Sequence, residues 1–540
     1  MRAILVASLA AVVVVTGSAS GQQTPASSYG EAVFVVSGRG YGHGVGMSQY
    51  GAYGQALAGR TYDQILAHYY TGTQIGRAGR KELRVLLAEG RPAVTVSSTV
   101  PFTAADATGA VYKLPKGSLT LRSDLSLPSD VGPVSVTQPL IIRPGKKVPL
   151  ALDGKPFRGK LELVPQSGFL RVVNIVALES YLQGVVAGEV PFSWPTEVLK
   201  AQAVAARSYA IASLLKGKPF DLYSDARSQM YLGVAGEKPS TTKAVADTAG
   251  EVVLYAGKVA TTYYFSTSGG KTASAADVFG FSVPYLVSRP DPWDKLSPYH
   301  RWGPVLLGAR TLQSKLDADA RVIDARGVGT PSGRLRTVTL ETVGGTEQIP
   351  ASLVRTALGL RSTWVTIGVL RLDRPSRGAV VFGSSTHLSG IGRGLGSPKL
   401  MSSLDGSSWS PMVTVAPDAV GVVDYDLRPV RTMRYRLEAE GGASPALLVQ
   451  VAPRITLSGP TVLEPGVLAG IVRPKRTGLA VEIERRKGTV WAPVGEATTD
   501  VTGAFRLELD TLVPAGSYRA RTAATADLAA GVSSTVQVTG

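Results

Sequence analysis

The sequence has no cysteine and only four histidines in 540 residues. Without cysteine the chain forms no disulfide, carries no lipid on a thiol and offers no thiolate to a metal, so its stability comes from packing. An isolated histidine is more often structural than catalytic, so each of the four is first interpreted as structural. Beyond the N-terminal residues no apolar run is long enough to cross a membrane. A hydrophobic content of 44% then predicts a globular protein.

The N-terminus, MRAILVASLAAVVVVTGSASG, has a cation at Arg2, an apolar run from Ala3 to Val15 and small residues from Gly17 to Ser20. This pattern is typical of a cleavable secretory signal, so residues 1–20 are set apart from the fold. An uncleaved membrane anchor is the alternative, but the run is shorter than the roughly 20 residues that span a bilayer. We therefore expect a secreted protein without a membrane span after cleavage.

The charge balance favours a polyanionic neighbour. Lysine and arginine number 57 against 40 aspartates and glutamates, a net charge of +17. Such a balance suits an acidic polymer such as cell-wall glycan or an anionic envelope polymer. Nucleic acid is the competing partner, yet the basic residues are scattered and no interleaved stacking motif accompanies them. Export also argues against nucleic acid, so we expect none.

Residues 176–215 carry the most informative pattern, two apolar helices on either side of one acid. The first is predicted from 178 to 188, because apolar residues recur every three to four positions and Pro191 disfavours helical angles just before it. The second is predicted from 195 or 196 to 217. Glu189 lies between them, where partial desolvation would raise its pKa toward values useful for proton donation. Arg207 could stabilise the charged form of Glu189. The alternative interpretation of the same spacing is that Glu189 is a solvated helix end and Arg207 a surface cation.

Glycine occupies every second position from 38 to 46, in the segment GRGYGHGVGMSQYGA. In an extended chain this alternation leaves one face bare, which a sugar ring or a neighbouring strand could approach closely, while His43 projects from the other face. The run does not fit G-x-G-x-x-G between a strand and a helix and lacks the lysine of a phosphate loop, which excludes nucleotide binding. Short helices are predicted after Ser48 and after Thr61, the latter with a capping box.

The chain is long enough for about three domains. After a linker at 21–29, the first domain is predicted at 30–366, with a β-rich layer leading into the central helices and a hairpin that turns at Ala256-Gly257. Residues 367–452 and 453–540 are short alternating runs broken by turn residues. Each suits a small immunoglobulin-like β-sandwich, so the predicted fold class is α+β with two sandwiches at the C-terminus.

Three separate motifs in the first domain together resemble one family. They are GYGHGVGMSQYGA at 40–52, ALESYLQGVVAGEVPFSWPTEVLKAQAVAARSYA at 177–210, and DARSQMYLG at 225–233 with STSGGKT at 266–272. In combination they resemble stage II sporulation protein D (SpoIID) and the LytB amidase enhancer, over residues 30–366. The tail tracts have no part in this likeness.

The resemblance implies a lytic transglycosylase of peptidoglycan, associated with the cell wall, that acts on glycan strands. It places the catalytic acid at Glu189 and gives Arg207 a role beside it in catalysis. The residues that the resemblance and its motifs make candidates for substrate binding are His43, Gln49, Tyr41, Gln202, Tyr231 and Ser268.

Two departures from the family pattern matter. The GHGVGMSQ segment here precedes the helices instead of following the SGG loop, so the motif order is permuted and the segment must fold back. Some members bind zinc through cysteines near the SQxY segment, and because this chain has no cysteine we expect no metal and no cofactor.

Several functions stay open at this point. The leading one is cleavage of the MurNAc-GlcNAc bond with formation of 1,6-anhydroMurNAc, for which one carboxyl suffices. Ordinary glycoside hydrolysis needs a second acid, for which Asp225 or Asp277 is available. The main alternative is a non-catalytic, wall-binding enhancer of an N-acetylmuramoyl-L-alanine amidase, and a purely adhesive surface protein is the third. The biological process, sporulation or another form of wall remodelling, is not defined by the sequence.

Overall fold

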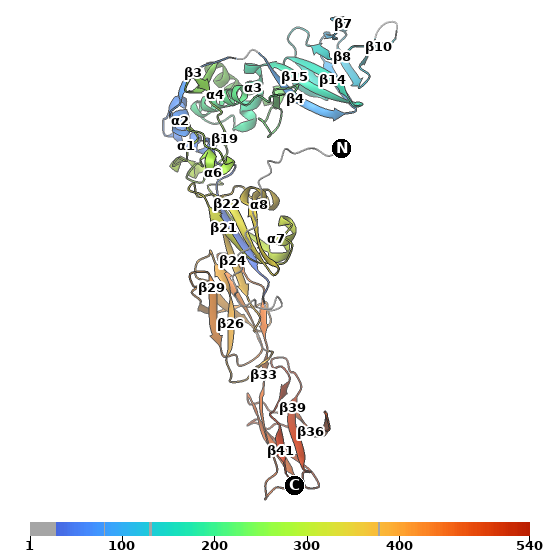
Figure 1. Cartoon of the computed structure of the whole chain (residues 1–540), viewed down its shortest axis with the longest axis vertical. Coiled ribbons are helices and arrows are strands. Elements are labelled where there is room, and N and C mark those ends of the chain that lie inside the picture. Colours follow the sequence, from blue (N-terminus) through green and yellow to red (C-terminus); the bar gives the residue numbers. More distant parts are fainter. Residues whose placement is uncertain (1–28, 80–81, 129–131, 376–377, 540) are drawn as a thin grey trace. The chain divides into compact units, whose positions relative to one another are not determined.

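A computed structural model describes residues 29–79, 82–128, 132–375 and 378–539 (Figure 1). The predicted signal and all but the last residue of the predicted linker lie outside the described residues. The chain forms two compact units. We call residues 34–319 and 324–367 the central unit, and the described residues 29–33, 320–323 and 368–539 the tail unit.

The described residues form a mixed, strand-rich fold in which all eight α-helices belong to the central unit. The helices are α1 (Gln49–Leu57), α2 (Tyr62–Tyr69), α3 (Leu178–Glu189), α4 (Thr196–Ala212), α5 (Pro239–Asp247), α6 (Ala275–Phe279), α7 (Ala309–Leu316) and α8 (Ala351–Leu358). Two 3-10 helices, Gly233–Gly236 and Pro292–Leu296, complete the helical set. Among the residues that the structure describes, no helix is both long and apolar enough to cross a membrane.

A β-rich layer fills residues 82–177, as the sequence predicted. A seven-stranded sheet has the order β16-β4-β15-β14-β11-β6-β7 and a four-stranded sheet the order β13-β12-β5-β8. Their strands are β4 (Glu82–Arg91), β5 (Ala93–Ser98), β6 (Phe102–Ala105), β7 (Val111–Leu114), β8 (Gly117–Arg122), β11 (Leu140–Arg143), β12 (Leu150–Leu152), β13 (Lys155–Phe157), β14 (Lys160–Gln166), β15 (Phe169–Ala177) and β16 (Leu222–Tyr223). A small pair is formed by β9 (Ser126–Leu127) and β10 (Val134–Ser135).

Strand β15 leads directly into α3 (Figure 1), so the sheet and the helices share one hydrophobic core. Leu182 and Val185 on α3 and Leu199 on α4 are buried together with Val85 and Val172 of the sheet. Burying each such side chain contributes about 1.5–3 kcal/mol, which fixes α3 against the sheet. The last residue of α3, Glu189, is thereby held in one place.

A second core lies on the other side of α4. There α1, α2 and the sheet β3-β17-β18 pack around Val204, Ile65 and Val253, and β2 pairs in parallel with β19. The strands are β2 (Met47–Ser48), β3 (Gln74–Arg77), β17 (Glu251–Tyr255), β18 (Lys258–Val259) and β19 (Tyr264–Phe265), and the unit also holds β20 (Arg301–Gly308), β22 (Leu335–Thr342) and β23 (Gly345–Pro350).

Local sequence signals explain most helix ends. Ser48 Oγ accepts a hydrogen bond from Gly51 N–H at the start of α1, and Gln64 Oε1 accepts one from Thr61 N–H at the start of α2. Helix α3 ends where Pro191 predicted. Helix α4 instead ends at 212, five residues before the predicted end at 217. The chain turns there because Leu215 N–H donates to Asp221 O at 2.9 Å, and Leu215 packs near Phe220 instead of extending the helix.

The tail unit consists of short strands in separate sheets. Its strands are β25 (Val380–Val381), β26 (Thr386–Arg393), β27 (Lys399–Ser403), β28 (Ser410–Thr414), β29 (Val422–Leu427), β30 (Met433–Ala439), β31 (Gly442–Ala443), β32 (Leu447–Val449), β33 (Val451–Ala452), β34 (Arg454–Ser458), β35 (Val467–Arg473), β36 (Ala480–Lys487), β37 (Val490–Thr498), β38 (Ala504–Glu508), β39 (Gly516–Thr522), β40 (Gly531–Val532) and β41 (Val536–Val538). Three further strands have residues in both units, β1 (Val33–Arg39), β21 (Val322–Gly329) and β24 (Val365–Leu372).

Candidate functional site

Glu189 is the last residue of α3 and is partly buried. The next residue, Val190, has extended angles (φ −133°, ψ 150°), as expected for a residue that precedes a proline. Burial raises the pKa of the Glu189 carboxyl above its usual value, because the charged form loses solvation. The helix end and the turn therefore produce an acid that keeps its proton to a higher pH than a surface glutamate.

Two hydrogen-bond donors face this carboxyl. Met230 N–H donates to Glu189 Oε1 at 2.9 Å, and the Tyr264 hydroxyl also bonds the carboxylate. Both bonds favour the charged form and lower the pKa of Glu189, so they offset part of the effect of burial. Among the described residues no cation pairs with Glu189. The group is thus prepared both to release a proton and to be stabilised once it has done so.

A buried amide orients the Tyr264 hydroxyl. Gln229 Nε2 donates to Tyr264 Oη at 2.9 Å and to Ala206 O at 3.2 Å, while Tyr181 Oη donates to Gln229 Oε1 at 3.1 Å. Because Tyr264 Oη accepts from the amide, its own hydrogen is left to point at Glu189. This chain of hydrogen bonds joins α3, α4, β19 and the loop that carries Gln229 at the acid. Spacing did not identify Gln229 or Tyr264, although both lie in or beside motifs that the sequence singled out.

Arg207 does not steady Glu189, which corrects the expectation from the sequence. Its guanidinium, fully buried, binds the Glu179 carboxylate through Nε at 2.9 Å and Nη2 at 2.7 Å, and donates to the carbonyls of Val245 and Glu251. Glu179 lies in the first turn of α3, at the opposite end from Glu189. Arg207 therefore ties α3 to α4, α5 and β17 and acts on the acid only by positioning its helix.

The glycine-rich segment folds back onto residues 263–268. Four of its five glycines, at 40, 42, 44 and 46, have positive φ, for example 111° at Gly42 and 80° at Gly46, so the expected extended alternation is wrong. The bare sides face protein: a Cβ on Gly42 would lie 2.8 Å from Phe265 Cβ, and one on Gly46 would overlap Tyr263 O. A neighbouring strand, not a sugar ring, takes the space, and this close contact positions Tyr264.

His43 and Glu189, both within the described residues, share no hydrogen bond; His43 instead binds the backbone of Tyr264, whose hydroxyl bonds the acid. Its Nδ1 accepts from Val45 N–H at 3.0 Å, so Nε2 carries the hydrogen that is donated to Tyr264 O at 3.1 Å. Burial, followed by the charge of Arg334, lowers the pKa of His43 to about 4, and the ring is neutral at pH 7. The permuted segment thus meets the residue that binds Glu189, and His43 holds the backbone of that residue.

The other predicted substrate-binding residues divide by exposure. Gln49 and Gln202 are 8% and 0% exposed and bond each other at 3.4 Å, and Ser268 is 0% exposed with its Oγ accepting from Gly270 N–H. These three offer no surface to a glycan, which corrects the expectation of direct contact. Tyr231 is likewise only 5% exposed and its hydroxyl donates to Asn174 Oδ1, so it too offers almost no surface to a glycan. Tyr41, 40% exposed beside Tyr299, is the accessible one of these residues.

A partly exposed aromatic cluster follows the acid, and the sequence analysis did not predict it. Trp194 stacks on Tyr53 with ring centroids 4.7 Å apart and meets Tyr50 edge to face at 5.0 Å. Trp194 lies five residues after Glu189, in the turn between α3 and α4. Aromatic faces of this kind present large apolar surfaces with fixed geometry. In the sequence, the only signals for this cluster were the tyrosines at 50 and 53 and the Ser193-Trp194 pair.

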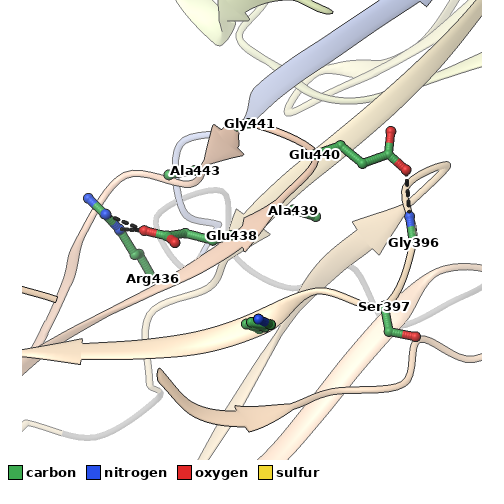
Figure 2. A pocket seen from close by; sticks show the side chains of 10 residues that line it. Gly396, Ser397, Arg436, Glu438, Ala439, Glu440, Gly441 and Ala443 are labelled. Carbon is green, nitrogen blue, oxygen red and sulfur yellow. Dashed lines mark hydrogen bonds and ion pairs between the residues drawn. The ribbon is translucent and has the colours of Figure 1, made fainter. Parts of the chain in front are cut away.

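The tail unit has a pocket of about 510 Å³ between the residues around 396–399 and 436–443 (Figure 2). Arg436 pairs with Glu438 there, and Glu440 Oε1 accepts from Gly396 N–H at 2.9 Å. Across the described residues no group of three or more histidines, aspartates or glutamates could hold a metal ion.

A comparison with protein families matches part of the central unit that includes Glu189. Residues 166–255 match the model of the family described as SpoIID, stage II sporulation protein. The match includes Glu189, Arg207 and Gln229 but ends before Tyr264, and it does not reach His43.

Three relatives are similar to parts of this chain. An uncharacterized protein of Brachyspira hyodysenteriae is 42% identical over 138 residues, covering 25% of this chain and 38% of that protein. Stage II sporulation protein D of Bacillus amyloliquefaciens is 32% identical over 212 residues (35% and 60%), and the amidase enhancer of Bacillus subtilis 37% over 147 residues (27% and 20%). The chain thus spans between a fifth and three fifths of the length of these relatives.

Solved structures add nothing to the fold assignment. The human OSCAR ligand-binding domain is 12% identical, with 31% of this chain and 96% of that chain covered, but its TM-score is 0.14. Residues 166–255 thus carry a stage II sporulation protein D domain, and parts of the chain are similar to stage II sporulation protein D and to the amidase enhancer.

Proposed function

We propose that this protein is a secreted, cell-wall-associated lytic transglycosylase that cleaves the MurNAc-GlcNAc bond of peptidoglycan. Glu189 protonates the glycosidic oxygen as the bond to the anomeric carbon breaks. The resulting carboxylate then accepts the proton of the sugar's own 6-hydroxyl, whose oxygen attacks the anomeric carbon. The product is 1,6-anhydroMurNAc, no water is consumed, and Glu189 is protonated again.

The geometry around Glu189 supports both halves of this cycle. Burial favours the protonated acid that the first half needs, and the Met230 N–H and Tyr264 hydroxyl stabilise the carboxylate that the second half needs. Proton transfer by a positioned side chain typically contributes about 10² to 10⁴ in rate. The aromatic surface of Trp194 and Tyr50 is available for the glycan.

The observation that carries the proposal is that neither candidate for a second carboxyl is free to act with Glu189. Of the two candidates for a second carboxyl, Asp225 is paired with Arg227 at 2.7 Å, and this contact lowers its pKa. Asp277 accepts hydrogen bonds from the hydroxyl and N–H of Ser332. Hydrolysis with a pair of acids needs a second free carboxyl across the scissile bond. Internal attack by the substrate's hydroxyl does not.

A second function, enhancement of a cell-wall amidase, is favoured by one observation. A relative that is 37% identical over 147 residues is named amidase enhancer. In that case Glu189 would bind glycan, and the tail unit, with its two predicted immunoglobulin-like sandwiches, would hold the chain on the wall. In the transglycosylase proposal the tail unit has the same supporting role.

The products of one digestion separate these functions. The purified chain is incubated with isolated glycan strands, and the released fragments are analysed by mass spectrometry. We expect 1,6-anhydro ends. Reducing ends would show a hydrolase and contradict the lone-acid scheme. If neither appears while an added amidase is stimulated, the enhancer function replaces the proposal.

A further inference from the structure

Arg334, one residue before β22, carries a guanidinium that is buried with most of its donors unused. The residue is 1% exposed, and Nη1 donates to Gly42 O at 3.3 Å. The other two donor atoms, Nε and Nη2, find no acceptor in the part of the chain that the structure describes. A buried charge with unused donors is unfavourable, so a group that accepts from both atoms would bind here with a gain in free energy.

Nε and Nη2 form one edge of a guanidinium, and elsewhere in this chain that edge binds a carboxylate. Arg207 uses both atoms to bind Glu179, at 2.9 and 2.7 Å. Arg158 uses both to bind Glu237, at 2.6 and 2.7 Å. The same edge of Arg334 presents two parallel N–H groups, a geometry that fits two oxygens of one oxyanion. The unused edge therefore identifies an oxyanion as the missing partner.

A second arginine without a counter-ion lies beside it. Arg355, in the last turn of α8, is partly buried and donates from Nε to Leu360 O at 3.4 Å. Burial, followed by the charge of Arg355, lowers the pKa of Arg334 to about 10, so both groups are still cations at pH 7. Neither forms an ion pair with any residue that the structure describes. Two unbalanced cations suit a phosphate group, which carries about −1.5 to −2 at pH 7, better than a carboxylate with its single charge.

The pair is connected to the surface. Arg361 lies over the rings of Tyr41 and Tyr299, with distances of 5.6 and 4.1 Å to their centroids. Tyr41 is 40% exposed, and it also lies near Arg355, whose pKa is lowered by burial and raised in part by Tyr41. Of the three arginines only Arg334 is fully buried, so an anion that arrives from solvent meets Arg355 or Arg361 first.

Arg334 also supports the glycine-rich segment. Gly42 O accepts its hydrogen bond, and a Cβ on Gly44 would lie 2.3 Å from Arg334 Cζ, so the segment packs directly on the guanidinium. His43, between these glycines, binds the backbone of Tyr264. Repulsion between Arg334 and Arg355 opposes this packing, and a bound anion would remove the repulsion. A ligand at the two arginines therefore stabilises the segment that positions Tyr264.

We propose that Arg334 and Arg355 form a binding site for a phosphate group, in which the Nε–Nη2 edge of Arg334 donates to two oxygens and Arg355 balances the second charge. The phosphate is either inorganic or the end group of an anionic envelope polymer. The two arginines lie outside residues 166–255, the segment matched by the family model. Only the effect of the site on catalysis rests on the proposed function; binding itself does not.

Calorimetry on the full chain tests the site with inorganic phosphate, glycerol phosphate and acetate, at an ionic strength held constant with sodium chloride. We expect saturable binding of one phosphate per chain, at least about tenfold tighter than acetate, as one further charge contact provides. Arg355→Gln and Arg334→Lys, which keeps the charge but lacks the two-donor edge, should each bind phosphate at least about tenfold more weakly. Arg336→Gln, at an exposed position of β22, is the matched control and should bind as wild type.

Melting temperatures separate a binding loss from a folding defect. Phosphate should raise the melting temperature of wild type and Arg336→Gln, and raise that of Arg355→Gln less. If Arg334→Lys melts early in chloride, the partly buried Arg355 carries the test. Binding of glycerol phosphate as well as inorganic phosphate supports a polymer end group, and binding of inorganic phosphate alone supports the free ion.

Absence of saturable phosphate binding overturns the inference, as does equal affinity in Arg355→Gln and Arg336→Gln. Acetate that binds as tightly as phosphate overturns the assignment of the ligand. Faster release of anhydro ends in the presence of phosphate would support the link to Tyr264. If phosphate binds as predicted while no strand is cleaved, the binding site stands and the proposed function fails.

Discussion

Glu189 in the central unit and the carboxylates of the tail pocket differ in the groups that bind them. In the tail pocket Glu438 is paired with Arg436, which also stacks over Trp409 at 4.0 Å, and Glu440 accepts from a backbone N–H (Figure 2). In the central unit Glu189 is partly buried with neutral donors and no cation. A charged partner would hold a carboxylate ionised, whereas neutral donors leave it able to take up and release a proton.

The comparison indicates that the type of partner bound to a carboxyl group, more than its position in a pocket, identifies it as a candidate for proton transfer. The tail pocket is of similar size to a cavity beside Glu189 that Met230 lines, at about 510 against 460 Å³. Only the central one adjoins an acid whose pKa burial has raised. The following variants test this contrast, from the largest expected effect to the smallest.

Removing the Arg207 guanidinium should have the largest effect. Arg207→Met leaves the carbonyls of Val245 and Glu251 without their donor and breaks the bond to Glu179. Breaking a buried pair costs about 3–5 kcal/mol, and the lower end applies because the Glu179 side chain is 38% exposed. Urea unfolding should show a loss of about 3 kcal/mol and no activity at 37 °C. Arg122→Met, on the surface of β8, is the control, and equal stability of the two variants would contradict the positioning role.

Removing the Tyr264 hydroxyl should cost activity without unfolding the chain. A hydrogen bond to a charged group is worth about 1.5–3 kcal/mol, so Tyr264→Phe should lower the rate at least about tenfold. The bond lowers the pKa of Glu189, so its loss should move the alkaline limb of the pH-rate profile upward. Tyr255→Phe serves as the matched control. A reduced rate with an unmoved profile would make Tyr264 merely structural.

Asp291 should make the stability of the central unit depend on pH. Burial raises its pKa to about 7, and the negative charge of Asp294 adds to the rise. The folded chain then binds a proton more tightly than the unfolded chain, so this stabilisation is complete below about pH 4 and is lost as the pH rises through 7. At about 1.36 kcal/mol per pH unit the loss approaches 4 kcal/mol.

Melting temperatures of wild type and Asp291→Asn between pH 4 and 8 measure this effect. The wild type should lose stability relative to the variant across that range. Asp63→Asn, at an exposed position of α2, should follow the wild type. Parallel curves for wild type and Asp291→Asn would mean that Asp291 is ionised at all these values.

The smallest effect is expected in the tail pocket. Glu438→Gln removes a carboxylate that is already paired with Arg436, so the rate of anhydro-end release from soluble strands should stay within about twofold of wild type. Wall co-sedimentation should be measured alongside. A loss of activity as large as that in Tyr264→Phe would erase the contrast between the two units.

The sequence predicted the acid and its helix well, because the signals are local. Pro191 ends α3, the capping residues start α1 and α2, and Ala256-Gly257 turns a hairpin. The partners were not predictable from spacing, since they are distant in sequence. Glu179 and Arg207 are 28 residues apart, and Met230 meets Glu189 across 41. Predicting such pairs requires the packing of α3 against α4 and the loops, which no periodicity encodes.

The glycine segment shows the same limit. Alternation correctly indicated a close neighbour, but positive φ angles replace the expected extended strand, and the neighbour is residues 263–268. Buried positions of Gln49, Gln202 and Ser268 could not be inferred, because polar side chains are usually exposed and only the packing of α1 against α4 covers the two glutamines.

The most direct test of the account is Glu189→Gln, compared with Asp225→Asn on the same glycan strands. The substitution keeps the size of the side chain and removes its transferable proton. We predict a loss of about 10⁴ in the release of 1,6-anhydro products, at the upper end for general acid-base catalysis, with folding and glycan binding retained. Asp225→Asn should stay near the wild-type rate. Undiminished anhydro product from Glu189→Gln, or an equal loss in Asp225→Asn, would contradict the claim that Glu189 acts alone.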